Sequence, residues 1–289
     1  MTTKRDGFQS RIGFVLAAAG AAVGLGNIWG FPTQAANHGG GAFLLVYFIV
    51  IFALALPALF TELYIGYSAQ ANPVVALKRA WQNKAPKLGA GAGYLGLAGA
   101  IVMLSFYSIV AGWMLSHALA PIAQLVGMKE LADFLSNDST TRNLVFTPLM
   151  LLLTASIILK GVKSGIETWS RRLMPLLLVL LVGLIFYIGS LDGASEGFAN
   201  YLKPDFDKVW DADLIIAAMG QAFFSLSLGV GCMMIYGSYL RPGANLGKLT
   251  LSVAALDTSV AFLAGLLILY SEPLNSPLPS GRDRRTVFA

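Results

Sequence analysis

Long stretches without a charged side chain constrain this sequence more than any other feature. Four of them run from Arg11 to Glu62, from Lys87 to Lys129, from Arg172 to Asp192 and from Asp213 to Arg241. A helix crosses the hydrocarbon core of a bilayer with roughly 20 apolar residues, so each stretch has room for a membrane-spanning helix. Only 12% of the residues are charged and 56% are hydrophobic. A soluble enzyme or binding module needs more polar residues to cover its surface, so the composition argues against both classes.

The apolar runs predict an all-α membrane protein with seven transmembrane helices. A polar, glycine-rich turn at 37–41 separates the first two runs, and loops that contain charged residues separate the others. The expected spans cover residues 12–36, 41–68, 89–125, 143–159, 172–190, 213–240 and 248–270. The first ten residues lack the cleavage pattern of a secretory signal peptide.

The basic residues divide unequally between the two sets of loops. Thirteen lie before span one or in the loops after spans two, four and six, whereas the other side has four, which are Lys129, Arg142, Lys203 and Lys208. Short loops rich in Lys and Arg stay in the cytoplasm. We therefore expect a multi-pass protein of the cytoplasmic membrane with a cytoplasmic N-terminus. The lipid bilayer, rather than a nucleic acid, then accounts for the net charge of +5, and no sequence signal sets an oligomeric state.

Few residues in this sequence are suited to catalysis. The single cysteine, Cys232, excludes an internal disulfide and a cysteine-based metal site, and the two histidines, His38 and His117, lie far apart. We find neither the paired acid–base groups that an enzyme needs nor the pore-lining filter motif of a channel. The sequence therefore predicts neither an enzyme nor a channel, and no organic cofactor.

Small and polar residues interrupt the first and sixth spans near their midpoints. Span one contains Gly20, Gly24 and Gly26, and span six contains the segment 225–231 (SLSLGVG). A glycine costs roughly 1 kcal/mol in a helix interior. The Gly20–Gly24 spacing alone fits close helix packing equally well. Two interrupted spans, each at the start of a repeat unit, favour broken helices, which survive at bilayer depth only where they are buried or face a wet cavity.

Broken helices supply binding groups without charged side chains. The N-terminal end of a half-helix presents free N–H groups and a positive dipole end to an anion. The C-terminal end and the unwound carbonyls present oxygen atoms to a cation. Asn27, Ser225 and Ser227 add side-chain oxygens at the same depth. These parts predict a mid-membrane site for a small zwitterion together with Na⁺.

Three motifs lie in the first, third and sixth spans. They are the run 11–32 (RIGFVLAAAGAAVGLGNIWGFP), followed by Gln34 and the turn at 39–43; the triplet 105–107 (SFY) with Trp113; and the run 220–229 (GQAFFSLSLG). Together they resemble the neurotransmitter:sodium symporter family, which has the bacterial leucine-transporter fold, over about residues 4 to 270. The resemblance implies an inverted-repeat transporter that moves an amino acid together with sodium.

The resemblance also implies two sodium positions and one substrate pocket. The backbone oxygens of Gly20 and Val23 are the expected ligands of one sodium ion, and the Ala22 carbonyl, Asn27, Ser225 and Asp257 are those of the other. Leu25, Gly26 and the Tyr107 hydroxyl are the expected cradle of the substrate carboxylate. The other expected substrate contacts are Ala22, Gly24, Met103, Phe224, Ser225, Ser227 and Val230.

Three positions refine this expectation. Gly24 stands where amine-carrying relatives have an aspartate, so the expected substrate brings its own carboxylate, as an amino acid does. Asp257 places a fixed carboxylate beside the sodium, so chloride is expected not to be required. Glu62 is the other acid within a span, and two interpretations have equal support: a helix-end residue that reaches water, or a functional residue.

The repeat organisation predicts the N-terminal portion of a transporter. The expected parts are residues 1–10 (cytoplasmic segment), 11–190 (first five-helix repeat), 191–212 (extracellular loop), 213–270 (first two helices of the second repeat) and 271–289 (atypical tail). Either the sequence is a fragment, or a frameshift near Tyr270 replaced three further helices. The expected function is sodium-coupled symport of an amino acid, and the alternative is a non-transporting product of a disrupted transporter gene. In both cases we expect no transport by these 289 residues alone.

Overall fold

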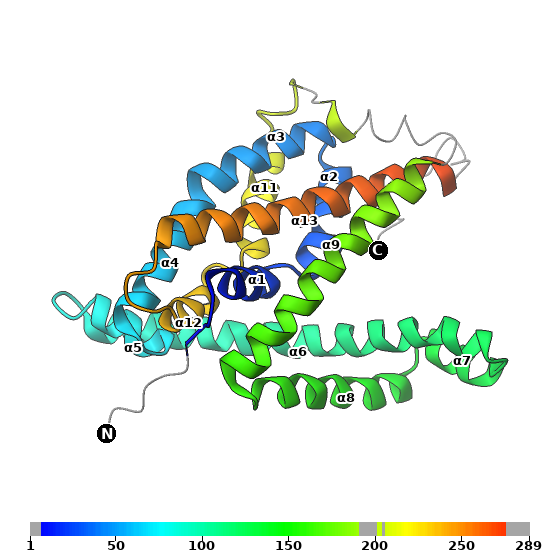
Figure 1. The fold of residues 1–289 in the computed structure, drawn as a ribbon. Helices are drawn as coiled ribbons and strands as arrows, with labels where there is room; N and C mark the ends of the chain where they lie inside the picture. The colour runs from blue at the N-terminus through cyan, green and yellow to red at the C-terminus, as the bar shows by residue number, and fades with distance from the viewer. Residues whose placement is uncertain (1–6, 191–200, 204–205, 276–289) are drawn as a thin grey trace.

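All regular elements are helical in the part of the chain that the computed structural model describes, residues 7–190, 201–203 and 206–275. Portions of the expected segments 1–10, 191–212 and 271–289 lie outside these ranges. The main elements (Figure 1) are α1 (Arg11–Ala22), η1 (Gly26–Gly30), α2 (Phe31–Asn37), α3 (Gly41–Val50), η2 (Ile51–Ala55), α4 (Leu56–Ala69), α5 (Pro73–Ala80), α6 (Pro86–Leu125), α7 (Lys129–Ser136), α8 (Thr140–Ile158), η3 (Val162–Glu167), α9 (Thr168–Gly189), α11 (Ala212–Ser225), α12 (Cys232–Ser238) and α13 (Leu246–Asn275). The η elements are π-helical.

Five helical rods in the described residues are long and apolar enough to cross a membrane. They are Gly41–Ala69, Pro86–Leu125, Thr140–Ile158, Val162–Gly189 and Leu246–Ile268. A sixth is obtained if α1 and the helix Gly26–Asn37 form one span with a bend of 60°. α11 has 14 residues, about 21 Å of helix, which is shorter than the roughly 30 Å hydrocarbon core. The all-helical membrane architecture is therefore present, with five or six spans by length against the seven expected.

Backbone conformation explains where α1 and α11 end. α1 stops at Ala22 because Val23 turns to an extended ψ of 118°, and helix resumes at Gly26. After α11, Ser227 has a φ of 53° and Gly229 a φ of 87°. Such left-handed conformations are accessible to glycine and uncommon for serine. Regular helix therefore stops in both small-residue segments that the sequence singled out.

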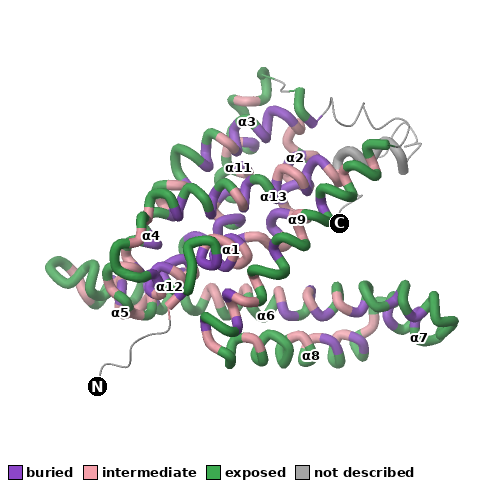
Figure 2. The backbone as a smooth tube through the Cα atoms, viewed as in Figure 1, coloured by how far each residue is buried: buried purple, intermediate pink, exposed green. Residues whose placement is uncertain are grey.

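The buried core surrounds α1. Apolar side chains of α1, α3, α4, α11 and α13 belong to one cluster, and α1 contacts both α9 and α13. α6 and α8 run side by side away from this core and are mostly exposed (Figure 2). In the most apolar stretch of α8 only 11% of the residues are buried. A bilayer or further protein covers exposed apolar surface of this extent, so α1 is an inner element and α8 an outer one.

Some helix boundaries differ from the prediction. The helix expected from residue 172 already begins at Val162. Lys163 and Arg171 limit the apolar run in the sequence, but they do not end the helix. α13 continues to Asn275, beyond the expected end at 270. α5 and α7 lie in expected loops. α5 begins where the side chain of Asn72 accepts a hydrogen bond from the Val75 N–H, which is a common N-cap.

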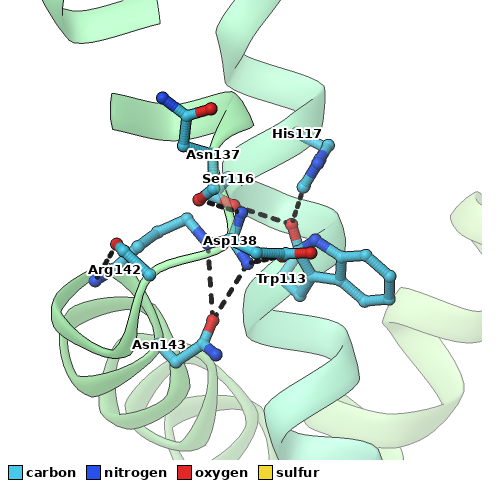
Figure 3. Close-up of polar contacts among 8 residues, drawn as sticks. Trp113, Ser116, His117, Asn137, Asp138, Arg142 and Asn143 are labelled. Atoms are coloured by element: carbon cyan, nitrogen blue, oxygen red, sulfur yellow. Dashed lines mark hydrogen bonds and ion pairs between the residues drawn. The ribbon is translucent and has the colours of Figure 1, made fainter. Parts of the chain in front are cut away.

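A buried arginine fastens the ends of α7 and α8 beside α6 (Figure 3). Arg142 is 1% exposed, and its guanidinium donates to Asn137 O at 2.7 Å, to Asp138 Oδ1 at 2.8 Å and to Asn143 Oδ1 at 3.1 Å. The Asp138 side chain is itself 81% exposed. The guanidinium therefore acts mainly as a hydrogen-bond donor to the turn between the two helices.

Replacing Arg142 by methionine is expected to destabilise the protein by about 2–4 kcal/mol, because a buried carbonyl and a side-chain amide oxygen lose their donors. Thermal unfolding of the purified protein measures this loss. Asp138→Asn is the matched control, and it should cost at most about 1 kcal/mol, since exposed ion pairs contribute little. Equal melting temperatures of the Arg142→Met variant and the unmodified protein would contradict the proposed role of Arg142 in holding this turn.

Candidate functional site

The C-terminal end of α1 carries carbonyl groups without helical partners. The Val23 N–H closes the last bond onto Ala19 O at 2.7 Å, and the helix then ends. The final carbonyls of a helix lack intrahelical donors, and the helix dipole adds negative partial charge there. Gly20, Ala22 and Val23, the expected backbone ligands of sodium, all lie at this end of α1.

Asn27 joins both interrupted helices to a third helix. Its fully buried Nδ2 donates to Ser225 Oγ on α11 at 2.9 Å. The same atom donates to Asp257 on α13, at 2.8 Å to Oδ1 and at 3.2 Å to the main-chain oxygen. Ser225 Oγ donates to Asp257 Oδ2 at 2.7 Å, and Asn27 Oδ1 accepts from the Gly24 N–H at 3.0 Å. Three of the expected sodium ligands therefore meet in one buried network.

Gly26 marks a close approach between the two interrupted segments. A Cβ atom at this position would lie 2.9 Å from the ring of Phe224, so a larger residue would have to displace that ring. The Gly26 carbonyl accepts from Gln221 Nε2 at 2.7 Å. Gly24 faces α6, where a Cβ atom would lie 3.7 Å from the ring of Tyr107. The expected carboxylate cradle of Leu25, Gly26 and Tyr107 therefore lies between α6 and α11.

One face of α6 follows the segment that connects α11 to α12. Val230 packs against Gly99, where a Cβ atom would lie 3.7 Å from Val230 Cγ1. Met103 and Tyr107 follow Gly99 at spacings of four residues, which places them on the same face of the helix. Met103 and Val230 are both partly buried. This face of α6 therefore runs past both interrupted segments.

The segment 226–231 is held from two sides. Ser227 Oγ donates to Ala21 O at 3.4 Å, and the Gly229 N–H donates to Glu62 Oε1 at 2.6 Å. Glu62 is 8% exposed. Its second oxygen, Oε2, is buried and has no hydrogen-bond partner in the described part of the chain.

Asp257 is a fully buried carboxylate without a basic partner in the described part of the chain. Hydrogen bonds from Asn27 and Ser225 reach both of its oxygens. Burial of an unpaired charge is costly, and a cation nearby is the usual compensation. The region therefore offers a negative charge and several oxygen ligands, the set that hard cations prefer.

Two contacts of the site were not predicted from the sequence. Gln221, 6% exposed, is part of the span-six motif but was assigned no role. A lone amide within the charge-free run from Asp213 to Arg241 is the signal that could have found it. The bond between Glu62 and Gly229 joins residues 167 positions apart, and no pattern in the sequence indicates it.

Comparison with known proteins supports a family assignment. The model of the sodium:neurotransmitter symporter family matches residues 5–139 and 124–271. The uncharacterized sodium-dependent transporter YhdH of Bacillus subtilis is 37% identical over 270 residues, which are 90% of this chain and 58% of YhdH. An uncharacterized sodium-dependent transporter of Haemophilus influenzae is 33% identical over 286 residues, 94% of this chain and 62% of the relative. The crystal structure of MhsT in complex with L-phenylalanine matches with a TM-score of 0.79 and 38% identity, covering 93% of this chain and 61% of MhsT.

The matches cover most of this chain but less than two thirds of each of these relatives. More distant similarity extends to the sodium- and chloride-dependent GABA transporter 2 of Mus musculus, at 27% identity over 311 residues. The family model, the sequence relatives and the MhsT structure agree with one another. This chain belongs to the sodium:neurotransmitter symporter family.

Proposed function

We propose that the chain forms the sodium- and substrate-binding part of a symporter that carries an amino acid across the cytoplasmic membrane. The observation that carries this proposal is the buried network of Asn27, Ser225 and Asp257 between two interrupted helices. It combines a carboxylate with uncharged oxygens at the position where the family resemblance implies a sodium ion. Family membership points to a transporter rather than an enzyme.

The geometry of the network supports a cation at its centre. Ser225 Oγ and two oxygens of Asp257 lie within 3.2 Å of Asn27 Nδ2. Three oxygen atoms, Ser225 Oγ and the two of Asp257, therefore lie together on this side of the Asn27 amide. The Ala22 carbonyl at the end of α1 adds a further ligand. We assign the Gly20 and Val23 carbonyls to a second sodium ion.

The proposed substrate is an amino acid with an apolar side chain. The backbone N–H groups of Leu25 and Gly26, at the start of the second half of span one, and the Tyr107 hydroxyl would hold its carboxylate. Gly24 leaves the ammonium group without an acidic partner. The proposed contacts with the rest of the substrate are Ala22, Met103, Phe224, Ser225, Ser227 and Val230. The L-phenylalanine in the MhsT complex is consistent with this substrate class.

We further propose that the interrupted helices are the first and sixth of seven membrane spans. α1 with η1–α2 forms the first, bent by 60°, and α11 with α12 forms the sixth. Residues 11–190 then make the first repeat and 213–270 the start of the second. The excess of basic residues in one set of loops supports a cytoplasmic N-terminus.

Uptake into proteoliposomes tests this function. The chain spans about six tenths of its relatives, so the assay uses the whole product of the gene. An inward sodium gradient is expected to drive accumulation of L-phenylalanine, and replacement of sodium by choline to abolish it. Because Asp257 provides a negative charge, replacement of chloride by gluconate should leave the rate unchanged.

Phenethylamine is the matched control substrate, since it lacks only the carboxylate. We expect no sodium-driven uptake of this amine, because it cannot use the proposed carboxylate cradle. Loss of phenylalanine uptake in gluconate would contradict the role of Asp257. Failure of a panel of apolar amino acids to enter would contradict the substrate class.

A further inference from the structure

We propose that Glu167 is a positioning residue whose buried carboxylate binds the N-terminal end of α1 to η3. We call this contact between Glu167 and residues 9–13 the latch. It sets how firmly the opposite end of α1 is held at the sodium site. Glu167 is the last residue of the π-helical segment η3, and α9 begins directly after it. Its side chain is 2% exposed. The uptake mechanism proposed above assigns this buried acid no role.

Both carboxylate oxygens of Glu167 reach the start of α1. The Gln9 N–H donates to Oε2 at 2.8 Å, and Ser10 Oγ contacts Oε1 at 3.3 Å. Ser10 is also the N-cap of α1, because its Oγ accepts from the Gly13 N–H at 2.9 Å. Glu167 therefore holds the capping residue of α1 from 157 positions away in the sequence.

The electrostatic setting favours this contact. The first amides of a helix lack intrahelical acceptors, and the helix dipole places positive partial charge at this end. In the described ranges no Lys, Arg or His forms an ion pair with Glu167. The start of α1 is therefore the compensating partner that the structure provides for this carboxylate. Hydrogen bonds to ionised groups are stronger than those between neutral groups.

The carboxylate of Glu167 packs tightly against α1. A Cβ atom on Gly13 would collide with Oε1 of Glu167, so the carboxylate lies directly on the backbone of the first turn of α1. π-helical segments are frequent at functional sites, and here the segment presents Glu167 toward α1. A substitution at Gly13 should consequently displace the same carboxylate from the other side.

α1 connects this latch to the proposed sodium site. Its 12 residues form one uninterrupted helix of about 18 Å, with Glu167 at one end and the Ala22 and Val23 carbonyls at the other. We call α1 docked when the latch is closed. If sodium binds only to the docked state, its apparent affinity is the intrinsic affinity multiplied by the docked fraction. Latch and ion are therefore coupled reciprocally, so that each stabilises the other by the same factor.

Hydrogen–deuterium exchange of the purified whole gene product tests the latch. Glu167→Gln keeps the size of the side chain but removes its charge. We expect exchange of the amides of residues 11–22 to rise about tenfold, a typical effect of losing a charge-assisted hydrogen bond. The apparent sodium affinity, measured as sodium-induced protection of the same amides, should fall by a smaller factor, because it follows the docked fraction of α1. Residues 41–69 serve as the internal reference and should not change.

Further variants separate this specific contact from a general packing role. Gly13→Ala should reproduce the effect of Glu167→Gln, and the double variant Gly13→Ala/Glu167→Ala should exchange no faster than Glu167→Ala alone, because both changes break one contact. Glu130→Gln, at an exposed position on α7, is the control for loss of charge.

Unchanged exchange in residues 11–22, or an equal rise in residues 41–69, would overturn the proposal. So would additive effects in the double variant. The coupling to sodium rests on the proposed function, but the exchange of α1 without sodium does not. If sodium does not protect the amides of residues 11–22 in the unmodified protein, the proposed sodium site is refuted. If sodium protects them but Glu167→Gln leaves their exchange unchanged, the latch alone is refuted.

Discussion

Replacing Asp257 by alanine is expected to abolish sodium-driven uptake and to weaken sodium binding by two to three orders of magnitude. A carboxylate about 4 Å from a cation at an effective dielectric near 20 contributes about 4 kcal/mol before desolvation. The change also removes acceptors from the buried Asn27 amide and the Ser225 hydroxyl. The sodium-induced rise in melting temperature measures the binding, and proteoliposome uptake measures the transport.

Asp257→Asn tests the charge separately from the shape. It keeps a side-chain oxygen but removes the negative charge, so it should weaken sodium dependence or create a requirement for chloride. Ser259→Ala is the control on the same helix, because Ser259 is exposed and its hydroxyl donates to Ala255 O within α13. An Asp257→Ala protein with an unchanged sodium-induced shift would exclude Asp257 as a ligand.

Replacing Gly66 by valine is expected to destabilise the protein by about 3 kcal/mol or more, or to prevent recovery of folded protein. A Cβ atom at Gly66 on α4 would collide with the main-chain oxygen of Met234 on α12, and one at Gly237 would collide with Leu63 O. Both obstacles are backbone atoms, so no side-chain rotation relieves them. Overpacking of a tight contact typically costs 1–3 kcal/mol, occasionally more.

Gly183→Ala on α9 is the matched control for this prediction. A Cβ atom at Gly183 meets nothing within 4 Å, so alanine there should be neutral or stabilise the helix by up to about 1 kcal/mol. Thermal unfolding and the yield of monodisperse protein compare the two variants. A Gly66→Val protein that melts like Gly183→Ala would show that α4 and α12 can separate without loss of stability.

The two halves of the site are thus held to the rest of the fold in different ways. α12 is joined to α4 by the reciprocal contacts of Gly66 and Gly237, and Glu62 on α4 also binds the Gly229 N–H. The start of α1, in contrast, is bound by the side chain of Glu167, and Phe8 just before it stacks on Tyr236 of α12.

The sequence predicted the long helices well because their signal is local. Spans expected at 41–68 and 89–125 correspond to helices at Gly41–Ala69 and Pro86–Leu125, since an apolar run must satisfy its backbone hydrogen bonds internally. The helix interruptions were also local, because the glycines and serines in 20–26 and 225–231 weaken helix wherever they stand. The prediction that the fifth span starts at residue 172, which relied on charge alone, was wrong. The helix formed by η3 and α9 begins ten residues earlier, at Val162.

The sequence by itself determined that this protein is helical and membrane-spanning, and its resemblance to a known family indicated Asn27, Ser225 and Asp257. Only the tertiary structure decided that these three side chains share one network, that Gln221 holds the Gly26 carbonyl, and that Glu167 lies on the start of α1. The physical reason is distance along the chain. Apolar periodicity and glycine content act within a few turns, whereas the partner of a buried polar group can lie more than a hundred residues away and is set by how the helices pack.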